Sequence, residues 1–197
     1  MAPDLDRALE LIDAAHAEDP NKTTPSNSTT TIPYELHYAT KMTSYLTKRS
    51  PNASPNLRIA IRAQHFRRWE VPRASYPMTR IGYHQWRTFL KKRQAELVSS
   101  LLADCGFGDQ DRQRVEELIR KEGLKEGDEE AQVLEDVACL VFLDDQFEEF
   151  KEKHDEGKIV NILRKTWGKM SREGQEMALG MDMDGECRRL VEKALAG

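Results

Sequence analysis

The sequence predicts an all-α protein with a single domain, and three observations lead to this fold class. Apolar residues recur with the three- and four-residue spacing of amphipathic helices along most of the chain. No stretch alternates apolar and polar residues as a half-buried strand does, and no internal repeat is present. The length, 197 residues, suits one hydrophobic core. We therefore expect one helical domain over residues 1–197.

Start and stop signals divide the first part of the chain. Residues 4–18 carry apolar side chains at helical spacing, and residues 20–32 are rich in Thr, Ser, Asn and Pro, which favours a flexible loop. Pro33 stands at the position that proline prefers, the first turn of a helix that runs to about residue 48. Ser54-Pro55 is a cap followed by proline, and it predicts a third helix through His65.

The second part begins with an irregular segment over residues 69–79, because Pro72 and Pro77 interrupt it. Beyond it, glycines, aspartates and serines mark the ends of further helices. The expected helices cover about residues 81–105, 109–123, 128–150 and 159–170, followed by short C-terminal helices over 171–197 with Ser171 and Asp184 as caps.

Composition points to a reducing compartment, and we expect a cytoplasmic protein. No apolar run approaches the ~20 residues of a membrane-spanning helix, so no membrane partner is expected. The start of the chain lacks the basic and apolar blocks of a secretory signal. Three widely spaced cysteines, Cys105, Cys139 and Cys187, match no zinc spacing and are expected to fill the core.

Charge is unevenly distributed. The net charge is −4, yet the window from Arg58 to Arg93 holds ten basic residues and one acid, Glu70. A basic region within an acidic protein favours an anionic small-molecule ligand, with nucleic acid as a second option. The alternative is that these arginines pair with acidic helices of the same chain. Arginine forks beside aromatic faces suit a phosphorylated ligand, so the candidate ligand-binding residues are Arg67, Arg68, Arg73, Tyr76, Arg80, Tyr83 and Trp86.

His65 is the candidate acid–base or metal-binding residue of this window. Leu57, Ala60 and Ile61 lie on one face of the third helix, and continued helical spacing turns His65 to the same inward face. A lone histidine on such a face is more often a hydrogen-bonded core residue. The basic, aromatic segment that follows His65 strengthens the functional interpretation.

Acidic residues elsewhere could complete a site with His65. Glu135 and Asp136 lie inside the apolar helix over 128–150, and Asp144 falls on its apolar stripe, so each needs a partner. A buried salt bridge is the simpler reason for such an acid. In the helix over 33–48, periodicity turns Glu35 inward and leaves His37 exposed, and we also expect His16 and His154 at the surface.

The order of these parts resembles the HD-domain phosphohydrolases, all-helical proteins that hold a divalent metal with His and Asp and cleave phosphoesters of nucleotides. The resemblance implies an HD-like helical bundle in which the first metal-binding position falls near Glu35 or His37 and the last on Asp136. We expect His65, Glu135 and Asp136 to be catalytic, and Glu35, His65 and either Asp136 or Glu135 to hold Mn, Fe or Mg. The chain departs from that pattern where the defining His-Asp pair falls on His65-Phe66, since Phe66 cannot bind a metal.

A second resemblance covers nearly the whole chain. The runs RAQHFRRWEVPRASYPMTRIGYHQWR, LEDVACLVFLDDQF and ILRKTWGKMS look like the domain of unknown function 4202, some members of which are labelled glutamyl-tRNA synthetases. The sequence argues against that label. Lys169-Met170-Ser171 copies the start of a synthetase loop, but no His-x-Gly-His motif and no alternating strand–helix nucleotide fold accompany it.

These observations predict an HD-like protein that binds a phosphorylated small molecule, a nucleotide above all, and hydrolyses it with the help of a divalent metal. Two alternatives stay open: a nucleotide- or RNA-binding domain without catalysis, which Phe66 favours, and a protein-interaction module.

Overall fold

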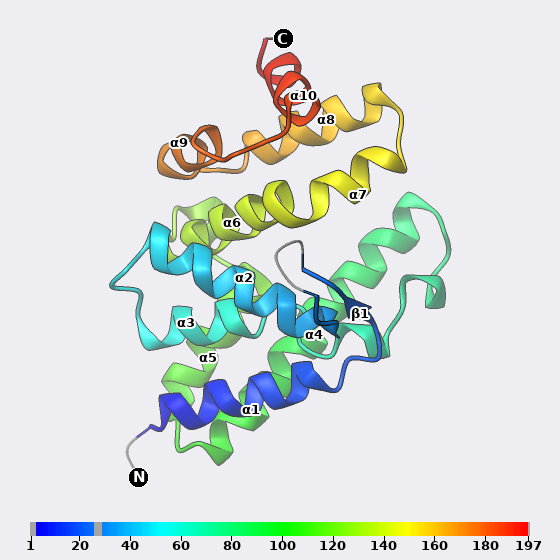
Figure 1. The fold of residues 1–197 in the computed structure, drawn as a ribbon. Coiled ribbons are helices and arrows are strands. Elements are labelled where there is room, and N and C mark those ends of the chain that lie inside the picture. The colour runs from blue at the N-terminus through cyan, green and yellow to red at the C-terminus, as the bar shows by residue number, and fades with distance from the viewer. Residues whose placement is uncertain (1–2, 26–28, 197) are drawn as a thin grey trace.

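The computed structural model describes residues 3–25 and 29–196, and within them the chain is all-α apart from one two-residue strand pair. The elements pack as one helical bundle, with the N-terminal helix at one end and the C-terminal helices at the other (Figure 1). This confirms the predicted all-α, single-domain architecture.

The first layer comprises three helices. Helix α1 (Leu5–Ala17) begins at an Asp4 cap, α2 (Tyr34–Arg49) lies over it, and α3 (Pro55–Arg62) begins at the Ser54 cap and carries Pro55 in its first turn. Between α1 and α2 the strands β1 (Lys22–Thr23) and β2 (Ile32–Pro33) pair antiparallel. The predicted flexible loop over 20–32 contains β1 and the first residue of β2, and its residues 26–28 lie outside the described ranges.

Helix α2 is capped by a residue distant in sequence. Pro33 precedes it and offers no side-chain cap, so the free N–H groups of the first turn need another acceptor. Asp19, fully buried beside β1, supplies one: its Oδ2 accepts the backbone N–H of Glu35 at 3.0 Å. This contact fixes the end of α2 that carries Glu35.

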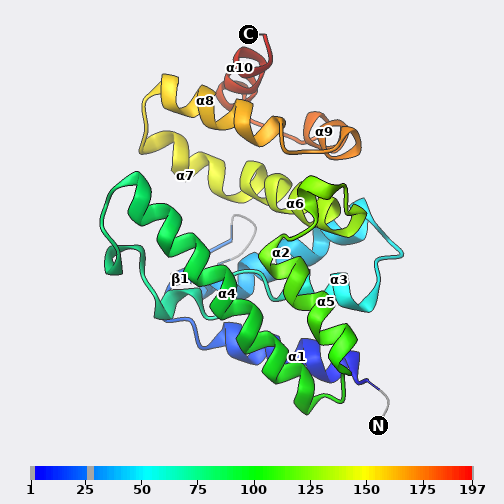
Figure 2. The same ribbon diagram turned by 180° about the vertical axis from the view of Figure 1, so that it is seen from behind.

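The second layer lies behind the first (Figure 2). Two short 3₁₀ turns, Arg68–Glu70 and Arg73–Ser75, lead into the long helix α4 (Arg80–Asp104), and α5 (Asp109–Arg120) packs antiparallel against its second half. A further 3₁₀ turn, Leu124–Glu126, leads to α6 (Glu129–Val141), which packs across α2.

The predicted helix over 128–150 is present with one irregularity. Helix α6 passes through a π-helical segment, Phe142–Gln146, into α7 (Phe147–Glu152) without leaving the helical path. Because a π turn inserts an extra residue, the side chains beyond it are rotated relative to a regular helix. Asp144, expected on the apolar stripe, lies inside the π-helical segment, is exposed and pairs with Lys41 at 2.6 Å.

Three helices cover α6 and α7 at the C-terminal end. They are α8 (Glu156–Trp167), α9 (Arg172–Leu179) and α10 (Gly185–Leu195). Ser171 and Asp184 cap α9 and α10 with their side chains, as predicted. The three cysteines are buried and free, which confirms their predicted place in the core.

Two histidines differ from their predicted positions. His37 is buried, because its Nε2 contacts Asp145 of the π-helical segment at 2.6 Å. His16 is fully buried, since its Nε2 lies 2.9 Å from the carbonyl oxygen of Arg62 at the end of α3. Both predictions of surface exposure were wrong because the partners lie on elements distant in sequence.

Candidate functional site: a basic pocket beside His65

The backbone around His65 leaves the helical conformation. Helix α3 ends at Arg62, three residues earlier than predicted, and His65 and Arg67 adopt left-handed conformations with φ of 65° and 50°. Such values are uncommon for residues other than glycine, and they gather at functional sites. The turn places Phe66 in the core, where its ring packs edge-on against His16.

Three side chains surround the His65 ring. Arg68 Nη1 lies 2.7 Å from Nε2, and Glu35 Oε2 lies 3.4 Å from Nδ1. The ring of Tyr38 stacks on the imidazole with centroids 4.2 Å apart and an interplanar angle of 11°. Because an arginine can only donate, Nε2 must accept, and the proton of a neutral imidazole belongs on Nδ1, facing Glu35.

Burial sets the protonation of this group. Burial, reinforced by Arg68, lowers the pKa of His65 well below its ordinary value. Burial also raises the pKa of Glu35 to about 8, although Arg68 acts in the opposite direction. The 3.4 Å contact therefore joins two neutral groups at neutral pH, and Glu35 Oε2 and His65 Nδ1 have no hydrogen bond within the described residues.

His65 and Arg68 line a pocket of about 340 Å³ between α4, α6 and α8, which we call the basic pocket. This volume lies within the range of small-molecule sites, about 300–1,000 Å³. Five cationic side chains line it, and Glu135 is the one carboxylate among the described lining residues. The cations are Arg68, Arg87, Lys91, Lys121 and Lys169.

The positive charge of the basic pocket is only partly compensated. Glu135 accepts a hydrogen bond from Lys121 and lies 3.5 Å from Lys169. Lys91 donates to the carbonyl of Arg120 at the end of α5, and burial followed by the nearby charge of Lys121 lowers its pKa. Arg87, which is half-buried, forms no hydrogen bond or ion pair with any residue that the structure describes. The pocket thus has room for an anion.

A second cavity of about 650 Å³ adjoins the first, and we call it the aromatic cleft. Arg68, Phe142 and Gln146 line both cavities, so the cleft lies next to the basic pocket at the π-helical segment. Its wall is rich in aromatic residues, and Glu35 also contributes to it. The aromatic lining residues are Tyr34, Trp69, Trp86, Phe142 and Phe150.

A family model matches residues 6–191, which include every residue of the basic pocket and the aromatic cleft. The chain belongs to the family described as Domain of unknown function (DUF4202). Comparison of this DUF4202 chain with curated proteins and with solved structures gives no match. Within the described residues, no helix is long and apolar enough to cross a membrane.

Asp136, predicted to act with His65, lies outside both cavities of the DUF4202 chain. It is fully buried and accepts hydrogen bonds from Arg49, Gln132 and Ser171. The predicted metal ligands Glu35, His65 and Asp136 are not among the described groups whose ligand atoms lie within 4.8 Å of one another. The structure brings Glu35 and His65 together, and Glu135 into the same pocket as His65.

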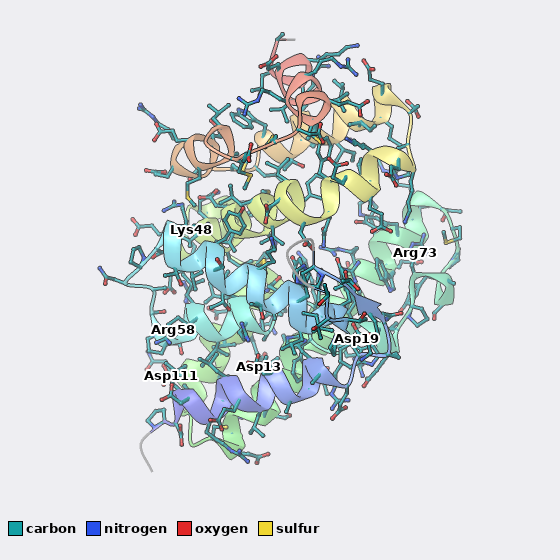
Figure 3. All side chains as sticks on the ribbon, viewed as in Figure 1. Asp13, Asp19, Lys48, Arg58, Arg73 and Asp111 are labelled. Carbon is teal, nitrogen blue, oxygen red and sulfur yellow. The ribbon has the colours of Figure 1, made fainter. Side chains whose placement is uncertain are left out.

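The predicted ligand-binding residues fall into separate places. Arg68 and Tyr83 line the basic pocket, and Arg73 and Trp86 line the aromatic cleft together with Arg68. Arg73 also stabilises its own loop, because its guanidinium donates hydrogen bonds to the carbonyl oxygens of Tyr76, Pro77 and Thr79. It lies on the opposite side of the molecule from Arg58 (Figure 3).

The remaining predicted residues are not in either cavity. Arg67 pairs with Glu18 and Glu70, both at 2.8 Å. Tyr76 packs near Phe89 on the outer face of α4, and Arg80 is exposed at its start. Arg67 thus follows the alternative given above, in which the basic residues form ion pairs with acidic residues of the same chain instead of binding a ligand.

Four cations of the basic pocket were not singled out from the sequence. Arg87 and Lys91 stand four residues apart, one helical turn after Tyr83, so helical spacing could have placed them on one face. Lys121 follows the end of α5 in a left-handed conformation, and Lys169 follows α8. No local pattern joins these two lysines to α4.

Proposed function

We propose that this protein binds a small phosphorylated molecule carrying several negative charges in the basic pocket. The observation that carries the proposal is the convergence of five cations on about 340 Å³ with Glu135 as the one described carboxylate, while Arg87 is half-buried and has no ion-pair partner among the described residues. Burying an uncompensated cation costs free energy, and a bound polyanion removes that cost.

The residue types favour phosphate over a single carboxylate. Arg68 and Arg87 offer planar forks that bind two phosphate oxygens at once, and lysines act as point charges around the same group. A phosphate chain spreads its charge over several oxygens, and cations from α4, the end of α5 and the end of α8 can reach different oxygens. The ligand then holds these helices together.

Metal-dependent hydrolysis, which the sequence led us to expect, stays a prediction outside this proposal. Glu35 and His65 could offer two ligand atoms, but Asp136 is bonded elsewhere and the Arg68 guanidinium contacts Nε2 of His65. These contacts favour a binding role for the pocket, with His65 orienting Arg68.

Titration calorimetry of the full chain with inorganic tripolyphosphate tests the proposal. Replacing Arg87 by Ala is expected to weaken binding by at least about ten-fold, because a charge-assisted hydrogen bond contributes roughly 1.5–3 kcal/mol. The melting temperature should not fall, since Arg87 has no hydrogen-bonding partner among the described residues. The matched control is Arg80→Ala, an exposed arginine on the same helix outside both cavities, and its affinity should equal that of the wild type.

Two results would contradict the proposal. One is the absence of tripolyphosphate binding at millimolar concentration and low salt. The other is an equal loss of affinity in the Arg87 and Arg80 variants, which would indicate attraction to the general charge of α4 rather than binding in the pocket.

A further inference from the structure

We propose that the ligand is a nucleoside triphosphate whose phosphates occupy the basic pocket and whose base occupies the aromatic cleft. This inference rests on the proposed function and adds the chemical class of the ligand. It requires that the two cavities be continuous, that the cleft have a free aromatic face, and that polar groups be available for the edge of a base.

The two cavities adjoin at the three residues that they share. Arg68, Phe142 and Gln146 line both, so one ligand can extend from one cavity to the other past these side chains. Arg68 lies at the junction with its guanidinium 4.9 Å from the ring centroid of Trp86. An arginine at this place can contact the phosphate nearest the sugar, where the charged and aromatic parts of a nucleotide meet.

Trp69 provides the free aromatic face. It is half-buried at the cleft, and it forms no hydrogen bond and no ring contact with any residue that the structure describes. Trp86, in contrast, is already occupied: Arg68 and Arg73 lie over its ring, and its indole N–H donates to the carbonyl of Val71. A base can stack on Trp69 with Phe150 of α7 nearby, while Trp86 supports the arginines.

Polar groups for the base edge are present in the same wall. The Glu35 side chain is only 6 % exposed, and its Oε2 has no hydrogen bond among the described residues. Gln146 donates to the Tyr34 hydroxyl at 2.7 Å, which leaves its carbonyl oxygen to accept. A flat ring with donors and acceptors on its edge uses both groups, whereas a sugar phosphate would leave the aromatic wall uncovered.

The charge of the basic pocket matches three phosphates. Five cations with one carboxylate leave four positive charges, close to the charge of a nucleoside triphosphate at neutral pH. A monophosphate would leave most of these cations without a partner.

The test compares the four common ribonucleoside triphosphates with inorganic tripolyphosphate, titrated into the full chain in the same buffer. We expect at least one nucleotide to bind about ten-fold more tightly than tripolyphosphate, since stacking on one aromatic side chain contributes roughly 1–3 kcal/mol, a factor of roughly five to 160. Trp69→Leu should remove that difference and leave tripolyphosphate affinity unchanged. Trp69→Phe should retain most of it, and Phe89→Leu, a control on the outer face of α4, should change nothing.

If every nucleotide binds the wild type with the same affinity as tripolyphosphate, this inference is overturned. The proposed function is tested separately, because a loss of tripolyphosphate affinity in Arg87→Ala would still support it. Tighter binding of a ten-nucleotide single-stranded RNA than of any mononucleotide, with steep salt dependence, would also overturn it. If Trp69→Leu does not fold, tryptophan fluorescence tests whether the base stacks on Trp69. The nucleotide should quench emission in the wild type and not in Trp69→Phe, and equal quenching in both would refute the placement of the base.

Discussion

Replacing Asp136 by Ala is expected to destabilise the junction of α6, α9 and α2 rather than the basic pocket. The carboxylate is fully buried and accepts from Arg49 Nε at 2.9 Å, Gln132 Nε2 at 2.9 Å, and the backbone and hydroxyl of Ser171 at 2.7 and 2.6 Å. The backbone of α9 also presses on it, since a Cβ added at Gly174 would lie 2.7 Å from the Asp136 carboxyl carbon.

The expected cost follows from what the change leaves behind. The Arg49 side chain is 16 % exposed, and losing Asp136 leaves it only Ser171 Oγ at 3.3 Å and Glu173 at 3.7 Å as partners. The backbone N–H and the hydroxyl of Ser171, the cap of α9, lose their acceptor as well. Removing one partner of a buried ion pair costs about 3–5 kcal/mol. For a chain of this length, that loss lowers the melting temperature by roughly 6–20 °C.

Urea denaturation followed by circular dichroism at 222 nm measures this cost. The control is Asp144→Ala, which removes a carboxylate from the same helical path but from a pair with Lys41 that is about one-third exposed. It should cost less than about 1 kcal/mol. A loss below about 1 kcal/mol for Asp136→Ala would refute the structural role.

Two further predictions concern Glu35 and Gly82. Burial raises the pKa of Glu35 to about 8, so the stability that its neutral form contributes is complete below about pH 4.5 and is lost as the pH rises through 8. Glu35→Gln does not titrate, and its free energy of unfolding should therefore rise relative to the wild type from pH 5 to pH 8, by up to about 1.4 kcal/mol per pH unit in urea titrations. Gly82→Ala should cost on the order of 1–3 kcal/mol in the same assay, because its Cβ would lie 2.1 Å from the Pro77 carbonyl oxygen.

These two predictions have internal controls. The lowered pKa of His65 makes both the wild type and Glu35→Gln less stable as the pH falls below its ordinary value, so this contribution cancels in the difference between them. A constant difference across the pH range would contradict the raised pKa. For Gly82, the control is Gly108→Ala, where a Cβ would meet nothing within 4 Å, and equal stability of the two variants would contradict the close approach of Pro77 to α4.

The helices could be predicted because their signals are local. Ser54 with Pro55, Ser171 and Asp184 each satisfy the free N–H groups of the turn that follows, and this chemistry acts over three or four residues. The end of α3 could not be predicted in the same way. Residues 63–66 carry no glycine or proline, and the left-handed conformation of His65 depends on its contacts with Tyr38, Glu35 and Arg68.

The candidate site was predictable only in part, because some of its residues are brought together by contacts between elements distant in sequence. His65, Arg68 and Tyr83 belong to one basic, aromatic window, so the sequence indicated them together as candidates. Lys121 and Lys169 reach the same pocket from the ends of α5 and α8, and only packing brings them there. Asp136 shows that residues adjacent in sequence need not share a site. Its neighbour Glu135 lines the basic pocket, while Asp136 faces α9.

The lining of the two cavities depends on the number of residues in the π-helical segment Phe142–Gln146. Phe142 and Gln146 line both cavities, and Phe150, which lines the aromatic cleft, follows the extra residue of the π turn. Deleting a single residue here would restore an ordinary helix and turn every later side chain of α7 by about 100°. The core could survive such a deletion while Phe150 left its wall, so a length difference of one residue among family members at this point would separate those that keep the cleft from those that have lost it.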